Sequence, residues 1–208
     1  MNFKRINWKT LSWLLAILAG VVMVAAATYM TGGMDVRFYF QPFAEGCLDC
    51  GFVPYYVQPM LAPLRLASFQ NVWALWMLIS VTGLLLIARQ TKINPLYFML
   101  AFPMIGQFWL GQIDVLVVFG AFLAINQRNS YLRGLGILLM LVKPQISILA
   151  VIYLLWREDR SQLLKVLAVP AAVFALSLVV YGLNWPLEWF INAQNNIPGH
   201  PWKLPAEF

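Results

Sequence analysis

Three polar clusters interrupt an otherwise apolar sequence, and their residue types could support acid–base chemistry on an anionic substrate. Gln112 and Asp114 stand at the start of the apolar segment GQIDVLVVFGAFLAINQR, and Lys143 stands inside LLMLVKPQISILA. Asp35 follows the first long apolar run. Ionisable groups at membrane depth are costly, so they usually pair or line a wet cavity. A carboxylate can act as a general base, while Lys143 and Arg37 could hold a phosphate.

The same residues also fit a structural role. Asp114 and Lys143 could form an ion pair, and Asp35 could be a solvated loop residue near Arg37. We favour a functional pocket, because all three clusters are expected on one side of the membrane. Nearby aromatic residues suit stacking against sugar rings or prenyl chains, and they equally suit an interfacial belt. They are Phe38, Tyr39, Phe40, Tyr55, Tyr56, Phe108 and Trp109.

Other kinds of catalytic site find little support in the sequence. It has no Walker-type phosphate loop and no G-x-S-x-G elbow. Cys47 and Cys50 lie in GCLDC, and His200 is the single histidine, so a zinc site lacks ligands. No metal site is therefore predicted. A local disulfide and two unpaired thiols both remain open, whereas redox catalysis is disfavoured because no thioredoxin-like βαβ pattern surrounds the pair.

The elements that position these residues must be membrane helices. The 208-residue chain is 62% hydrophobic and 11% charged, with a mean hydropathy of +0.73. Soluble domains carry roughly 25% charged residues. The net charge of +6 comes from basic residues at the ends of apolar runs rather than from a patch, so no nucleic-acid partner is expected. We predict an all-α polytopic membrane protein, with residues 1–208 forming a single membrane domain.

Five full spans and two half-helices, about seven apolar helices, account for the apolar runs. A span needs about 20 apolar residues. Residues 11–30, 72–88 and 166–182 each supply one, and residues 94–125 supply two spans joined by a turn around residues 106–112. The N-terminal run is kept as an anchor and not a cleaved signal.

Residues 134–156 form either one kinked span or a re-entrant hairpin that breaks at Lys143-Pro144. The hairpin is favoured, because it avoids a charge at mid-membrane and segregates the basic residues better. It implies a cytoplasmic N-terminus, an external loop with interfacial helices at residues 31–71 and an external C-terminal tail at residues 183–208. The cytoplasmic side then holds Lys4, Arg5, Lys9, Arg89, Lys92, Arg128, Arg133, Arg157, Arg160 and Lys165, and the other side Arg37, Arg65, Lys143 and Lys203.

Four segments, in this order, resemble the GT-C superfamily of polyprenol-phosphate-sugar-dependent glycosyltransferases. They are GGMDVRFYFQPF, VPYYVQPMLAPLRLASFQNVWALW, GQIDVLVVFGAFLAINQR and RGLGILLMLVKPQISILAVIYLLWR. Within that superfamily they are most similar to the mannosyltransferase-like glycosyltransferase family 87, once called DUF2029. The resemblance covers residues 32–157, and the helix count also resembles the N-terminal module of the superfamily.

The resemblance implies a membrane glycosyltransferase that transfers a mannose-like sugar from a polyprenyl-phosphate donor at the extracytoplasmic face. Asp35 would be the catalytic base, and Lys143, with Arg37, would bind the leaving phosphate. Gln112 and Asp114 would line the pocket, and the aromatic Tyr39 would bind substrate. The lipid-phosphate sugar is then a substrate, no cofactor or metal is expected, and the location is the inner or plasma membrane of a prokaryote.

The sequence also departs from the pattern of the family that it resembles in two respects. The family usually carries asparagine where this chain has Asp114, and its members continue with further spans after the segment that begins near Trp185. The chain ends at Phe208. This pattern fits a minimal enzyme, or half of a split enzyme whose partner subunit supplies the remaining helices, or a derived relative kept for its shape. Membrane lipids are expected as partners in each case. The alternative is a catalytically inactive structural subunit of a larger membrane complex.

Overall fold

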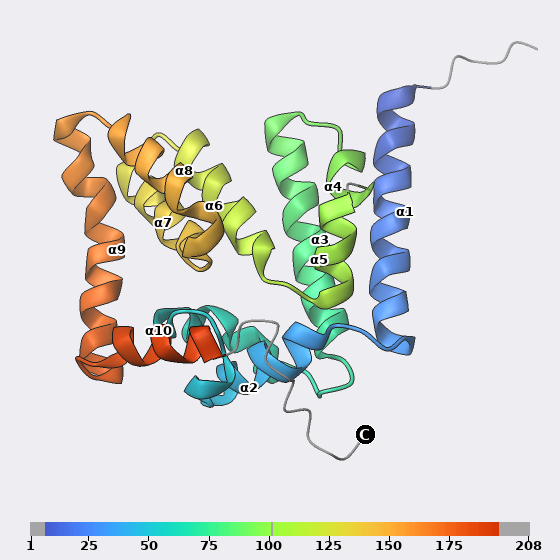
Figure 1. The fold of residues 1–208 in the computed structure, drawn as a ribbon. Coiled ribbons are helices and arrows are strands. Elements are labelled where there is room, and N and C mark those ends of the chain that lie inside the picture. Colours follow the sequence, from blue (N-terminus) through green and yellow to red (C-terminus); the bar gives the residue numbers. More distant parts are fainter. Residues whose placement is uncertain (1–6, 101, 196–208) are drawn as a thin grey trace, which may run out of the picture.

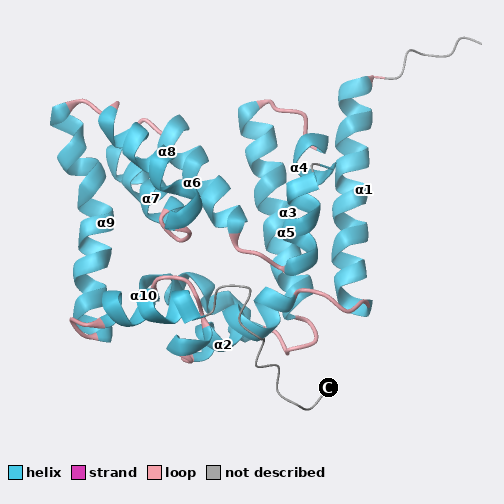
Figure 2. Ribbon diagram, in the orientation of Figure 1, coloured by secondary structure: helices cyan, strands magenta, loops and turns pink. Residues whose placement is uncertain are grey.

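A computed structural model describes residues 7–100 and 102–195, and within these ranges the regular structure is helical throughout (Figure 2). The parts of the predicted tail beyond residue 195, including His200 and Lys203, lie outside the described residues. The elements are α1 (Trp8–Tyr29), η1 (Val36–Phe40), α2 (Gln41–Glu45), η2 (Leu48–Cys50), η3 (Tyr55–Leu66), α3 (Val72–Thr91), α4 (Leu96–Leu100), α5 (Phe102–Leu110), α6 (Asp114–Asn126), α7 (Ser130–Met140), α8 (Pro144–Trp156), α9 (Arg160–Tyr181) and α10 (Trp185–Asn195).

Helices α1, α3 and α9 are long and apolar enough to cross a membrane, with 22, 20 and 22 residues. At about 1.5 Å per residue they match the ~30 Å thickness of the hydrocarbon core. Most side chains of α1 and α9 are exposed on the protein, which suits contact with lipid. The prediction of an all-α membrane protein is confirmed.

Helices α4, α5 and α6 replace the two spans predicted from residues 94–125. α6 has 13 residues, and α4 and α5 have 5 and 9, so each is shorter than a full span. The turn between α5 and α6 lies at residues 111–113, at the end of the predicted interval, because α5 continues through Gly106. Gly111 ends α5 with a φ of +73°, a conformation that favours glycine.

Helices α7 and α8 form a hairpin and not one kinked helix, and its re-entry into the membrane remains a prediction. The start of α7 meets the end of α8 in an ion pair of 2.8 Å between Arg133 and Glu158. Ser130 also donates a 2.7 Å hydrogen bond to Gln162 in the first turn of α9. The chain therefore returns to the side from which α7 started, and Figure 1 shows both helices beside α6 in the same half of the molecule.

A layer of short helical segments lies across the C-terminal ends of α1 and α9 and the N-terminal end of α3, at the bottom of Figure 1. Its members are η1, α2, η2, η3 and α10. We call them the loop layer. Trp185 of α10 is 2% exposed and stacks on Tyr55 with ring centroids 5.7 Å apart. Cys47 and Cys50 form a disulfide in this layer. The predicted loop at residues 31–71 is thus packed helical structure, and its position at a membrane interface remains a prediction.

Candidate functional site

Asp35 is held at the start of η1, where the chain leaves α1 and enters the loop layer. It is 7% exposed. The preceding glycines pack against the ring of Trp73, and Gly33 adopts a φ of +67°. The Gly33 amide donates a 2.9 Å hydrogen bond to the carbonyl of Trp109 at the end of α5. These contacts bring the aspartate next to the turn that follows α5.

Gln112 lies in that turn and joins two chain-distant charges. Its Nε2 amide donates a hydrogen bond to Oδ2 of Asp35, and its Oε1 accepts one from Nζ of Lys143. The turn itself is held by α3, because the indole of Trp76 donates a 2.8 Å hydrogen bond to the carbonyl of Gln112. One amide group therefore connects the loop layer to the hairpin.

Lys143 stands at the tip of the hairpin and is 7% exposed. Its Nζ lies 2.7 Å from Oδ1 of Asp114, the first residue of α6. The tip is ordered from both sides: Ser147 donates a 2.6 Å hydrogen bond to the carbonyl of Met140, and the Tyr56 hydroxyl donates one of 2.7 Å to that of Leu141. We call the side chains of Asp35, Gln112, Lys143 and Asp114 the polar network.

Burial controls the acidity of Asp35. Removal from water raises the pKa of its carboxyl from 3.8 to about 6, since the charged form loses hydration. The charge of Lys143 and the hydrogen bond from Gln112 lower this pKa, and the nearby Asp114 raises it slightly. The carboxylate is thus ionised at neutral pH, yet it is a stronger base than an exposed aspartate.

Tyr39 and Arg37 occupy different surroundings, although both lie on η1. Tyr39 is half-buried and packs edge-on against Phe52, with ring centroids 5.5 Å apart. Burial raises the pKa of the Tyr39 hydroxyl, and the nearby carboxylate of Asp35 raises it further. Arg37 instead donates a 3.0 Å hydrogen bond from Nη2 to the carbonyl of Gln70. Its guanidinium carbon lies 5.5 Å from the ring centroid of Trp73. The structure does not bring Arg37 into the polar network.

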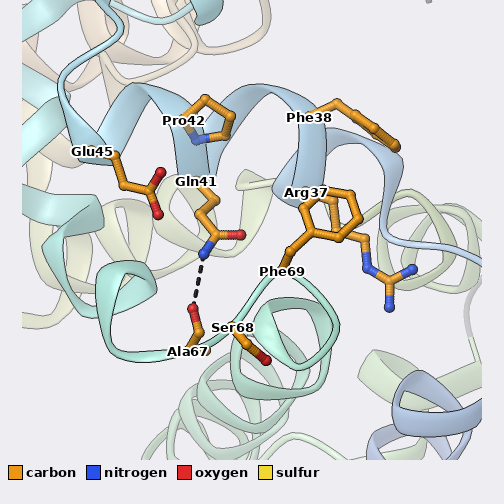
Figure 3. Close-up of a pocket in the computed structure, with 8 residues that line it drawn as sticks. All are labelled: Arg37, Phe38, Gln41, Pro42, Glu45, Ala67, Ser68 and Phe69. Atoms are coloured by element: carbon orange, nitrogen blue, oxygen red, sulfur yellow. Dashed lines mark hydrogen bonds between the residues drawn. The ribbon is translucent and has the colours of Figure 1, made fainter. Parts of the chain in front are cut away.

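A cavity of about 310 Å³ lies on the Arg37 side of η1. Figure 3 shows its lining residues, which are Arg37, Phe38, Gln41, Pro42, Glu45, Ala67, Ser68 and Phe69. None of the four polar-network residues lines it. The predicted base, Asp35, and this cavity therefore lie at two neighbouring places and not in one.

Two positioning residues escaped the sequence analysis. Tyr56 was named only among the aromatic residues that suit stacking on a substrate or an interfacial belt, yet its hydroxyl fixes the hairpin tip. Trp76 lies inside a predicted span, where nothing in the local sequence signals a hydrogen bond to residue 112.

Gln107, one turn before the end of α5, is 5% exposed, and its Nε2 has no hydrogen-bond partner among the described residues. We assign it no role.

The polar network combines a basic carboxylate with a buried ammonium group, which suits removing a proton and stabilising developing negative charge. Across residues 7–100 and 102–195, no group of three or more His, Cys, Asp or Glu side chains could hold a metal ion. The model of glycosyltransferase family 87 matches residues 54–198. That range contains Gln112, Asp114 and Lys143 and begins after Asp35. No curated protein and no solved structure matches the chain.

Proposed function

The chain belongs to glycosyltransferase family 87, and from this premise we propose that it transfers a mannose-like sugar from a polyprenyl-phosphate donor to an acceptor hydroxyl. One observation carries the proposal. The buried carboxylate of Asp35 and the buried ammonium of Lys143 are joined through Gln112 at one end of the membrane helices. A base and a cation are then held within reach of one substrate.

Asp35 acts as the general base in this mechanism. It takes the proton of the acceptor hydroxyl, and the acceptor oxygen forms a bond to the anomeric carbon of the sugar. The bond between that carbon and the phosphate oxygen breaks, and polyprenyl phosphate leaves with the electron pair. A base with a pKa near the working pH is effective in such a step, and burial brings Asp35 to about 6.

Lys143 stabilises the leaving phosphate. Negative charge grows on the phosphate oxygen during bond cleavage, and a fixed cation in a buried site stabilises that charge more than water does. Its ion pair with Asp114 keeps the ammonium in place before the donor binds. The apolar faces of α1 and α9 would contact the lipid bilayer that delivers the prenyl chain. No cofactor enters the mechanism.

We place the site at the extracytoplasmic face. The disulfide between Cys47 and Cys50 lies in the loop layer, and disulfides persist in oxidising compartments. The opposite ends of the helices carry most of the basic residues, as cytoplasmic ends do. These basic residues are Lys9, Arg89, Lys92, Arg128, Arg133, Arg157, Arg160 and Lys165.

A transfer assay on the reconstituted protein tests this function. Purified protein in nanodiscs receives polyprenyl-phosphate mannose labelled in the sugar, together with membrane lipid extract as acceptor. Appearance of label in a product other than the donor supports the proposal. Persistence of all label in the donor, with protein that melts cooperatively, contradicts it.

A structural subunit is the second candidate function, and one observation favours it. The ammonium of Lys143 is paired with Asp114 and also donates to Gln112, so the polar network also works as an internal ion pair. Under this alternative the protein purifies in a fixed ratio with a larger membrane complex and carries no prenyl-phosphate lipid. Quantitative mass spectrometry of the gently solubilised protein distinguishes the two functions.

A further inference from the structure

The cavity beside Arg37 lies outside the polar network and has no role in the mechanism above. It is formed where η1 and α2 face the chain that follows η3 (Figure 3). Its volume of about 310 Å³ is at the lower end of the ~300–1,000 Å³ range of small-molecule sites. The size suits one small ring better than an extended chain.

Buried polar groups of this cavity lack hydrogen-bond partners. Gln41 is 5% exposed, and its Nε2 donates a 2.9 Å hydrogen bond to the carbonyl of Ala67. Its Oε1 finds no donor within the part of the chain that the structure describes, and Nε of Arg37 finds no acceptor there. In Figure 3 the amide oxygen of Gln41 points away from Ala67. An unpaired buried acceptor is costly, so a donor supplied by a ligand would be favourable.

The remaining lining groups define the chemistry of that ligand. Glu45 and Ser68 are exposed, and each can accept a hydrogen bond from a hydroxyl group. Phe38 and Phe69 pack edge to face, with centroids 5.3 Å apart, and give the cavity an apolar surface. A neutral, hydroxyl-rich ring fits this mixture, because each hydroxyl both donates and accepts. A phosphate fits poorly beside the carboxylate of Glu45.

We propose that this cavity binds the sugar-like, polyhydroxylated part of the acceptor. The identification of the ligand as the acceptor rests on the proposed function. The binding of a sugar rests on the cavity alone. Asp35 immediately precedes η1 and Arg37 is the second residue of η1, so one short segment connects the proposed base to the cavity. The ring could belong to a soluble sugar or to the headgroup of a glycolipid.

Binding experiments in nanodiscs test the cavity directly. One arm measures saturation-transfer NMR signals and affinities for methyl glycosides of mannose, glucose and galactose. The other arm measures retention of monoglycosyl diacylglycerol, against diacylglycerol, by native mass spectrometry. The variants are Gln41→Met, which keeps length but loses the amide, and Glu45→Gln. Glu188→Gln on α10 is the matched control, because Glu188 is also exposed in the loop layer but does not line the cavity.

We expect wild-type protein to bind a probe in at least one arm, and both cavity variants to bind it about tenfold more weakly. Glu188→Gln should bind normally. Binding in the soluble arm identifies a free sugar, and binding confined to the lipid arm identifies a headgroup. If Gln41→Met does not fold, Glu45→Gln decides. Failure of the wild type to bind either kind of probe, or equal binding by the cavity variants and the control, overturns the inference. Binding that survives without any transfer activity contradicts the proposed function and leaves this inference standing.

Discussion

The carboxylate of Asp35 and the ammonium of Lys143 bind opposite ends of one amide, that of Gln112. The amide donates to the carboxylate and accepts from the ammonium, so its orientation is set by both charges. Three separate parts of the chain, the start of η1, the α5–α6 turn and the hairpin tip, therefore meet at a single side chain.

The pH dependence of transfer should report the raised pKa of Asp35. A general base works only when deprotonated, so we expect the rate to rise through pH 6 and to level off above it. Asp114→Asn should move the acid limb to lower pH, because the charge of Asp114 raises the pKa of Asp35. Initial rates between pH 4.5 and 8 measure both. Asp159→Asn, an exposed position at the start of α9, should leave the profile unchanged.

The same pKa shift makes a prediction about stability. Between pH 3.8 and about 6 the folded state binds a proton at Asp35 that the unfolded state has released. Stability contributed by this group is therefore present at low pH and lost as the pH rises through 6. Asp35→Asn should remove this contribution, and chemical denaturation of wild type and variant at pH 4 and pH 7 measures it. An identical pH slope in both proteins would show that Asp35 is not the group responsible.

Removing the ammonium of Lys143 should affect the rate more than the fold. Lys143→Met keeps the length of the side chain, and Asp114 can then be hydrated because its side chain is 34% exposed. Loss of a fixed charge that stabilises a transition state costs about 10²–10³-fold in rate. We expect a fall of that size in kcat, with a small change in melting temperature. Lys165→Met, near the end of α9 that lies away from the loop layer, is the control. Wild-type kcat in Lys143→Met would exclude the phosphate role.

Close contact between α6 and α7 should limit the size of residue 136. A Cβ atom on Gly136 would lie 2.5 Å from the backbone nitrogen of Ala124 and 2.6 Å from the carbonyl oxygen of Gly120. Gly136→Ala should therefore lower the free energy of unfolding by about 1–3 kcal/mol, the usual cost of overpacking. Gly83→Ala in α3 should not, because a Cβ there meets nothing within 4 Å. Thermal melts in detergent compare the two variants. Equal melting temperatures would contradict the close packing of α6 against α7 at Gly136.

The disulfide permits a test of orientation. After mild reduction, Cys47 and Cys50 should react with a membrane-impermeant maleimide added outside intact cells. A cysteine placed at Lys92, at the opposite end of α3, in a variant without the native pair should react only after permeabilisation. Labelling is measured by mass shift on a gel. The reverse pattern would place the loop layer in the cytoplasm.

Much of the helical architecture was predictable from residue patterns. The apolar run at residues 72–88 became α3, and Lys143-Pro144 marked the tip of the hairpin, because an intramembrane charge and a missing backbone donor both disfavour a continuous span. The short α6 was not predictable: an apolar run has no feature that separates a helix packed within a bundle from one that crosses the membrane. Composition alone cannot distinguish those two environments.

Four of the predicted site residues were expected to lie together, but the contacts that join them were not predictable. Asp35, Gln112, Asp114 and Lys143 were expected on one side, and the structure brings them into one network. That Gln112 bridges the two charges depends on three chain-distant segments, which no local pattern specifies. The role of Arg37, in contrast, could not be predicted from the sequence. An arginine two residues after the proposed base can bind phosphate or stack on aromatic rings, and only the fold places Trp73 beside it.

The transfer rate of Asp35→Asn tests the central claim most directly, because asparagine keeps the shape of aspartate but cannot accept the proton. Asp49→Asn serves as the matched control, since Asp49 is exposed in the same loop layer. The proposed mechanism predicts a rate at least about 10²-fold below wild type for Asp35→Asn, with the melting temperature retained and Asp49→Asn near wild type. Transfer by folded Asp35→Asn at the wild-type rate would contradict the assignment of Asp35 as the base.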